Sequence, residues 1–168
     1  MLFRELGIAD ATEAARIEAA AFEGDSPWSR DVILAEIAQP HTFYLGAFEE
    51  VSEGHEAGER MVSYGGVAML GPREDPEFEI HTIGVLPSHQ GRGIGRAMMD
   101  QFVHTADLLD APMFLEVRTD NEPALRLYEA FGFFILATRK QYYQPSGKDA
   151  YSMMRPRKSE RETGRPNT

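Results

Sequence analysis

Apolar residues return at helical spacing in two long segments, and capping residues mark two further helices. In residues 10–22 and 93–109, apolar side chains recur every three to four positions, as they do along one face of a helix. Ser29 and Asn121 are residue types that cap helix N-termini. The stretch after Ser29 stops before Pro40, and the stretch after Asn121 stops near Gly132. The pattern therefore predicts helices over residues 10–22, 29–38, 93–109 and 121–132.

Strand-like segments fill most of the remaining chain. They alternate apolar and polar residues, or are apolar throughout, as strands are. These segments are residues 2–6, 41–48, 61–70, 77–86, 113–117, 133–139 and 150–154. The acidic connection 49–60 contains glycine, and its ends are expected to form a hairpin. Antiparallel strands come first and a strand–helix–strand–helix–strand run follows, which predicts an α/β fold with an α+β type mixed sheet.

Length and tail composition set the expected domain boundaries. The chain has 168 residues, which favours one domain, and we expect it to span residues 1–155. Residues 156–168 are polar and charged, so a disordered tail is expected there. No apolar run approaches the roughly 20 residues of a membrane span, and the N-terminus does not read as a signal peptide. We expect a cytoplasmic protein without membrane contact, as a monomer or weak dimer.

Charge and cysteine content exclude several classes of function. The formal net charge is −10, whereas nucleic-acid binders carry a basic patch, so no direct nucleic-acid partner is expected. An acidic surface suits a cationic partner such as an amine. The chain has no cysteine, which rules out disulfides, Cys-ligated zinc and an acyl-cysteine intermediate. The histidines do not follow a metal-ligand spacing, so no metal is expected.

A glycine-rich loop joins the strand 77–86 to the helix 93–109. Gly91, Gly93 and Gly95 allow close approach of the backbone to an anion, and the N-terminus of the helix is positive. Arg92 and Arg96 add positive charge. The spacing fits neither the dinucleotide fingerprint nor the P-loop, because the third glycine comes one residue early and no Lys-Ser/Thr follows.

The loop does fit the pattern Gln-x-x-Gly-x-Gly, with Gln90, Gly93 and Gly95. This pattern, with Val85 and Pro87 before it and a helix after it, resembles the pyrophosphate-binding motif of the GNAT acetyltransferase superfamily. A second segment, residues 115–133, resembles the other signature of that superfamily: a strand, an Asn-capped helix with a tyrosine, and Phe-Gly-Phe.

Shorter stretches resemble the bacterial ribosomal-protein alanine N-acetyltransferases, the RimI family. They are Pro-Trp-Ser at 27–29, Leu-Glu-Val-Arg at 115–118, and Arg139, Tyr142 and Tyr143 before Asp149-Ala150. Lys148 departs from the acidic residue that the family often has before Asp-Ala, which weakens the inference on peptide selectivity. The resemblance implies a single GNAT domain that binds acetyl-CoA as co-substrate, and transfer of the acetyl group to the N-terminal amine of a ribosomal or other protein.

The resemblance also implies roles for individual residues. Glu116 matches the proton acceptor of the family and Tyr128 its proton donor. The strand end 83–85 matches the segment that pairs with the pantetheine arm, and a Val85 N–H would polarise the thioester carbonyl. The expected cofactor-binding residues are Ile83, Gly84, Val85, Gln90, Gly91, Arg92, Gly93, Ile94, Gly95, Arg96 and Asn121.

The chemistry of amide formation agrees with these roles and leaves alternatives open. An N-terminal amine has a pKa near 8 and must lose a proton before it attacks, which a carboxylate can accept directly or through water. A tyrosine can protonate the departing thiolate. Glu79, on the strand before the loop, is an alternative base, and His81 is a candidate to line the amine site. Acetylation of lysine or a small amine, and a non-catalytic acyl-CoA-binding regulatory module, remain alternative functions.

Overall fold

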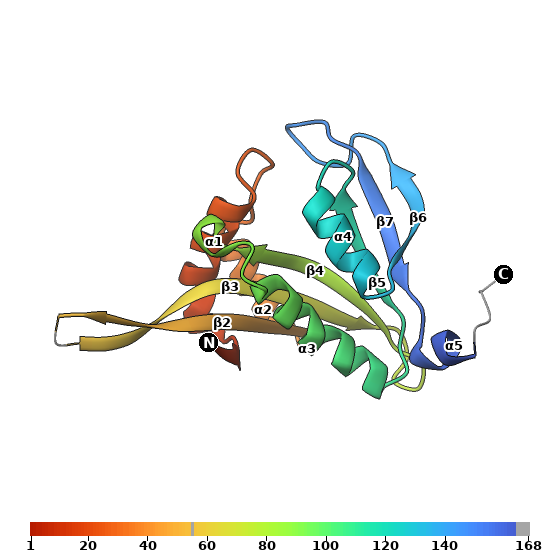
Figure 1. The fold of residues 1–168 in the computed structure, drawn as a ribbon, viewed down its shortest axis with the longest axis horizontal. Coiled ribbons are helices and arrows are strands. Elements are labelled where there is room, and N and C mark those ends of the chain that lie inside the picture. Colours follow the sequence, from red (N-terminus) through yellow and green to blue (C-terminus); the bar gives the residue numbers. More distant parts are fainter. Residues whose placement is uncertain (55, 164–168) are drawn as a thin grey trace. The chain divides into compact units, whose positions relative to one another are not determined.

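The computed structural model describes residues 1–54 and 56–163. Within these residues, seven strands form one mixed sheet in the order β1-β2-β3-β4-β5-β7-β6 (Figure 1). The strands are β1 (Leu2–Glu5), β2 (Thr42–Glu53), β3 (Glu56–Leu70), β4 (Glu77–Val85), β5 (Met113–Arg118), β6 (Phe134–Arg139) and β7 (Ala150–Arg155). The helices are α1 (Ala11–Ala21), α2 (Arg30–Ala38), α3 (Ile94–Leu108), α4 (Glu122–Ala130) and α5 (Lys158–Glu162), with 3-10 turns η1 (Ile8–Asp10) and η2 (Pro87–His89). The predicted fold class is confirmed.

The chain forms two compact units. The first unit consists of residues 1–67 and 81–98, and the second of residues 68–80 and the chain from Met99 onward. The strands β3 and β4 and the helix α3 each pass from one unit into the other. None of the helices in the described residues is long and apolar enough to cross a membrane.

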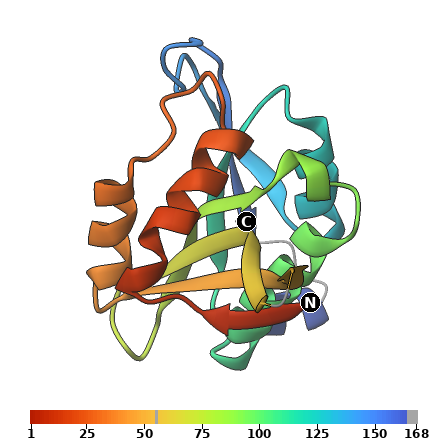
Figure 2. The ribbon, with the colours of Figure 1, turned by 90° about the vertical axis from the view of Figure 1, so that its left-hand side faces the viewer.

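The first unit packs α1 and α2 against its strands. Figure 2 shows the two helices side by side. The strand β1 pairs antiparallel with β2, with Leu2 opposite Phe48. Ser29 caps α2 as predicted, because its hydroxyl accepts a hydrogen bond from the Val32 N–H at 3.3 Å. Ile17 of α1 and Ile33 of α2 are completely buried in the core of this unit.

In the second unit, β5 pairs parallel with the first part of β4 and antiparallel with β7. Alternate residues of β5 are buried, namely Met113, Leu115 and Val117, so Glu116 lies on the opposite side of the strand. Asn121 caps α4 as predicted by accepting from the Ala124 N–H at 3.3 Å.

The hairpin expected at the ends of the acidic connection 49–60 is present. It is longer than expected, because β2 and β3 continue through most of the connection (Figure 1). Backbone pairing tolerates its polar side chains, since a hairpin arm exposes them to water.

The expected disordered tail, 156–168, contains the helix α5. Charged side chains attach this segment to the second unit: Arg157 pairs with Asp75 at 2.7 Å, and the Ser159 N–H donates to Asp110 at 2.9 Å. Disorder was therefore the wrong expectation for this stretch, and residues 164–168 of the expected tail lie outside the described residues.

Candidate active site

The glycine-rich loop leaves β4 at Val85 and enters α3 at Ile94. Gly91 and Gly93 have φ angles of 77° and 80°, in the left-handed region that favours glycine. A Cβ built on either residue would meet no heavy atom within 4 Å, so the space in front of the backbone is open. The Ala97 N–H donates to the Gly93 carbonyl at 3.0 Å, and the N–H groups of the turn before it have no intrahelical acceptor. This arrangement fits an anion of the size of a pyrophosphate.

Two side chains hold the entrance of the loop in place. The Gln90 amide donates to the Val85 carbonyl at 3.2 Å, which ties the loop back to the strand end. His89 is buried, and its Nε2 lies 2.9 Å from Glu49 of β2 while its Nδ1 lies 2.7 Å from the Ser88 hydroxyl. The sequence analysis did not select His89 or Glu49, because their positions in the sequence give no sign of this pairing.

Glu116, the expected base, belongs to the second unit and is half-buried. The Ser152 hydroxyl of β7 donates to its Oε2 at 2.7 Å, and the exposed Arg139 guanidinium lies 3.7 Å from Oε1. Both partners fix the orientation of the carboxylate, and within residues 1–54 and 56–163 its second oxygen has the long contact to Arg139 alone. A carboxylate held in this way can accept a proton from an amine or from a water molecule.

Tyr128, the expected acid, lies on α4 in the same unit. Its ring packs against Phe133 with centroids 5.8 Å apart, and burial raises the pKa of the phenol to about 12. Burial also raises the pKa of Tyr143, and the electrostatic effects of Tyr142, Tyr128 and Glu116 raise it further. Both phenols therefore keep their protons at neutral pH and are available as donors.

Glu79, the alternative base, is half-buried on β4 and lies in register with Phe114 of β5. It belongs to the second unit, together with Glu116 and Tyr128, whereas His81 and the glycine-rich loop belong to the first.

A buried carboxyl group in the first unit was missed by the sequence analysis. Glu18 of α1 accepts hydrogen bonds from the hydroxyls of Tyr64 and Thr82 and from the Trp28 N–H. Burial raises the pKa of Glu18, although these hydrogen bonds act in the opposite direction. The sequence spacing could have indicated that Glu18 is buried, because Glu18 follows the buried Ala14 by one helical turn and so lies on the same face of α1.

A second carboxyl group lies in the same unit. Glu36 of α2 accepts a hydrogen bond from the Tyr44 hydroxyl at 2.6 Å and lies 2.8 Å from His81 Nδ1. The rings of Tyr44 and Tyr64 stack with centroids 6.4 Å apart. His81 is therefore partly buried and hydrogen-bonded.

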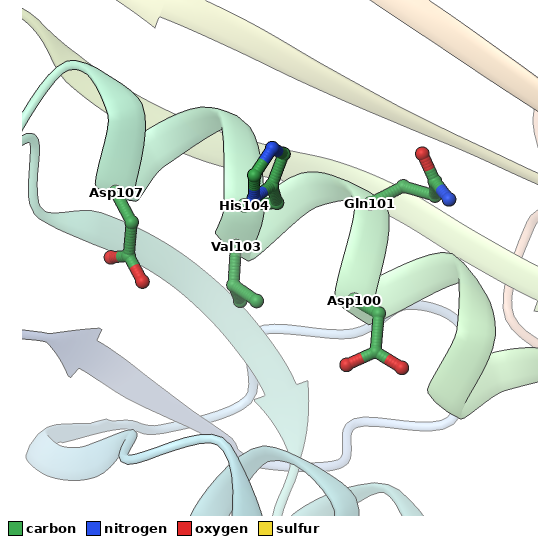
Figure 3. A pocket seen from close by; sticks show the side chains of 5 residues that line it. All are labelled: Asp100, Gln101, Val103, His104 and Asp107. Carbon is green, nitrogen blue, oxygen red and sulfur yellow. The ribbon is translucent and has the colours of Figure 1, made fainter.

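A shallow pocket lies on one side of α3 in the second unit (Figure 3). Its lining residues are Asp100, Gln101, Val103, His104 and Asp107. Asp107 is already paired with Arg155 and Arg161, at 2.7 and 2.6 Å. Among the described residues no group of three or more His, Asp or Glu side chains is placed to hold a metal ion. The pocket therefore adds no candidate for the chemistry.

Comparison with known proteins identifies relatives of the chain. A model of the acetyltransferase (GNAT) family matches residues 11–133. The N-alpha-acetyltransferase RimI of Mycobacterium tuberculosis is 43% identical over 147 residues, covering 88% of this chain and 87% of that protein. A putative ribosomal protein bS18 alanine N-acetyltransferase of Bacillus subtilis is 32% identical over 152 residues, covering 89% and 91%. The crystal structure of the ribosomal-protein-S18-alanine N-acetyltransferase from Escherichia coli matches with a TM-score of 0.70 at 26% identity, covering 92% of both chains.

Proposed function

Since the chain belongs to the GNAT acetyltransferase family, and is an acetyl-CoA-dependent N-acetyltransferase, we propose that its acceptor is the N-terminal amine of a protein. The observation that carries this proposal is the 43% identity to an N-alpha-acetyltransferase over most of both chains. The resemblance in the stretches 27–29 and 115–118 points to the same acceptor.

Backbone groups of the loop 91–95 and of the end of β4 bind the pyrophosphate and the pantetheine arm of acetyl-CoA. The pyrophosphate lies on the N–H groups of Gly91–Gly95 and on the first turn of α3, where two left-handed glycines leave room for it. The strand end Ile83–Val85 pairs with the pantetheine arm, and the Val85 N–H polarises the thioester carbonyl. Arg92 and Arg96 add positive charge, and Asn121 contributes from the start of α4.

Glu116 and Tyr128 carry the proton transfers. The amine nitrogen attacks the thioester carbon, and Glu116 accepts the proton that this nitrogen loses as the C–N bond forms. The C–S bond then breaks, and Tyr128 donates its proton to the departing thiolate. The raised pKa of Tyr128 keeps the phenol protonated until that step. No acyl-enzyme forms, which agrees with the absence of cysteine from the sequence.

The acceptor is expected to be a ribosomal protein that begins with alanine. The relatives in Bacillus subtilis and Escherichia coli carry that substrate in their names. Ribosomal proteins are basic, and a chain of net charge −10 attracts such a partner through its long-range field. The reaction then takes place in the cytoplasm, where ribosomal proteins are made.

Turnover of acetyl-CoA against a panel of acceptors tests the proposal. The panel contains peptides that differ only in their first residue, peptides with a blocked N-terminus and one lysine, and a small polyamine. We expect the highest kcat/KM for N-terminal alanine. Preference for the blocked lysine peptide or the polyamine would assign the enzyme to another acceptor class.

A further inference from the structure

His81 and Glu36 form a dyad on the same strand that leads into the cofactor loop. His81 lies on the same side of β4 as Ile83 and Val85, since alternate residues of a strand share a side. Its Nδ1 lies 2.8 Å from Glu36 Oε2. All four residues belong to the first unit, so the dyad and the expected acetyl-binding end of β4 are parts of one compact body.

The surroundings of Glu36 set the tautomer of His81. Burial opposes ionisation of Glu36, but the hydrogen bonds from Tyr44 and His81 outweigh it and hold the pKa of the carboxyl below its ordinary value. An ionised carboxylate can only accept hydrogen bonds, so His81 Nδ1 carries the hydrogen. The lone pair of the neutral ring is then on Nε2. No hydrogen-bond partner of Nε2 occurs among the described residues, and 22% of the side chain is exposed.

Other titratable groups surround the dyad. Burial, together with Glu36 and Glu18, raises the pKa of Tyr44 far above neutral, and burial and Glu18 do the same for Tyr64. Burial raises the pKa of Glu18. The exposed His41 contributes a weaker electrostatic effect on Glu36, and Glu79 lies two positions before His81 on β4. A neutral imidazole accepts a proton at its unprotonated ring nitrogen, which in His81 is Nε2.

We propose that the His81–Glu36 dyad takes the first proton from the substrate ammonium, before Glu116 acts. This inference rests on the proposed function. A protonated N-terminus carries three hydrogens on nitrogen and the amide product carries one, so two protons must leave. His81 Nε2 accepts the first, and Glu36 stabilises the imidazolium through Nδ1–H, after which the proton passes to water. Glu116 accepts the second as the C–N bond forms, and the thiolate receives the proton of Tyr128.

The dyad therefore predicts how kcat/KM depends on pH. Near pH 6.5 most of an amine with a pKa near 8 is protonated, whereas at pH 9 most of it is neutral. A proton acceptor for the ammonium matters at the lower pH and loses its importance at the higher one. A residue that only shapes the site would matter equally at both.

The experiment compares His81→Asn and Glu36→Gln with the wild type, using an N-terminal alanine peptide and saturating acetyl-CoA from pH 6.5 to 9. His81→Asn keeps a donor near Glu36 but has no base at the position of Nε2. We expect kcat/KM to fall by about tenfold or more at pH 6.5, within the range typical of acid–base groups, and to approach the wild type at pH 9. Glu36→Gln should show the same trend with a smaller loss. His104→Asn, an exposed position on α3, serves as the matched control and should follow the wild type.

A loss of kcat/KM that is equal at every pH, or no loss in a folded variant, overturns the proposed role of the dyad. If His81→Asn does not fold by circular dichroism, the pH profile of Glu36→Gln decides alone. The two proposals fail differently: a wild type that acetylates no N-terminal peptide removes the proposed function, whereas an active wild type with an unchanged His81→Asn profile removes only the dyad.

Discussion

The two units of the chain surround carboxyl groups with different hydrogen-bond donors. In the first unit, Glu18 and Glu36 accept hydrogen bonds from tyrosine and threonine hydroxyls, a backbone N–H and a histidine. In the second unit, Asp107 lies between two guanidinium groups, those of Arg155 and Arg161. Glu18 and Asp107 show the contrast, whereas Glu36 has a lowered pKa like Asp107 although its donors are a tyrosine and a histidine.

The difference appears in the direction of the pKa shifts. Burial raises the pKa of Glu18, while the hydrogen bonds and charges of Arg155 and Arg161 outweigh burial and lower the pKa of Asp107. Glu18 therefore contributes stability that is present below its unfolded-state pKa and is lost as the pH rises through its folded-state pKa. Asp107 contributes stability that is present above its unfolded-state pKa and is lost as the pH falls through its folded-state pKa.

The largest expected effect concerns Glu116, which has one short hydroxyl contact and one long arginine contact. Glu116→Gln keeps the shape of the side chain but removes the acceptor, so kcat should fall by about 10²–10⁴-fold with unchanged acetyl-CoA affinity. The loss should persist at high pH, unlike that of His81→Asn, because Glu116 accepts the second proton, which even a neutral amine loses as the C–N bond forms. Steady-state kinetics across pH measures this, with Glu122→Gln on the exposed start of α4 as control.

Tyr128→Phe should lower kcat by a similar factor without recovery at high pH, because its defect concerns the leaving group. If Glu116→Gln retains the wild-type rate while Glu79→Gln is inactive, the base lies on β4. If none of these carboxylates matters, the enzyme works mainly by holding amine and thioester together.

Removing the carboxylate between the arginines should produce the largest loss of stability. Asp107→Asn leaves Arg155, whose side chain is only 5% exposed, without its charge partner, so unfolding should become easier by about 3 kcal/mol. Urea denaturation at pH 7 measures the free energy of unfolding. Asp100→Asn, on the same helix and side (Figure 3), is the control and should lie within about 0.5 kcal/mol of wild type. Equal losses in both variants would show that the ion pairs do not stabilise the second unit.

We expect the loop 90–96 of the first unit to bind acetyl-CoA mainly through backbone N–H groups, with Arg92 and Arg96 adding positive charge. Gly95→Val places a branched side chain at the start of α3 and should weaken acetyl-CoA binding by more than tenfold, or about 1.4 kcal/mol. Titration calorimetry measures the affinity. Gly58→Val on β3, where a Cβ would also meet nothing within 4 Å, is the control. Unchanged affinity in a folded Gly95→Val protein would place the pyrophosphate elsewhere.

The smallest expected effect concerns pH dependence. Glu18→Gln cannot ionise, and it keeps one acceptor oxygen for the Tyr64 hydroxyl while its amide nitrogen replaces the oxygen that accepts from the Trp28 N–H. Because the pKa of Glu18 is raised, its ionisation opposes folding, so between pH 4 and pH 8 the variant should gain up to about 1 kcal/mol of stability relative to wild type. Thermal unfolding at both pH values measures it, and the same difference in Tm between variant and wild type at both would refute the interpretation of this carboxyl group.

Local signals in the sequence predicted the elements that local interactions determine. Ser29 and Asn121 cap their helices as expected, and the glycine spacing of residues 91–95 marked the turn into α3. The extension of the hairpin through 49–60 depends on backbone pairing between its two arms, which polar side chains do not indicate. The helix α5 depends on partners far away in the sequence, such as Asp75 for Arg157. The dyad of His81 and Glu36 joins residues 45 positions apart, so no spacing rule reveals it.

The acceptor nitrogen is the central claim, and one measurement locates it. A peptide with a free N-terminal alanine and one internal lysine is incubated with acetyl-CoA and the enzyme, and fragmentation mass spectrometry places the added acetyl group. A lysine ammonium has an ordinary pKa near 10.4, against about 8 for an N-terminal amine, so the two sites also differ in how easily they lose a proton. The account predicts a single acetyl group on the α-nitrogen of alanine. Acetylation of the lysine with a free N-terminus remaining would contradict it.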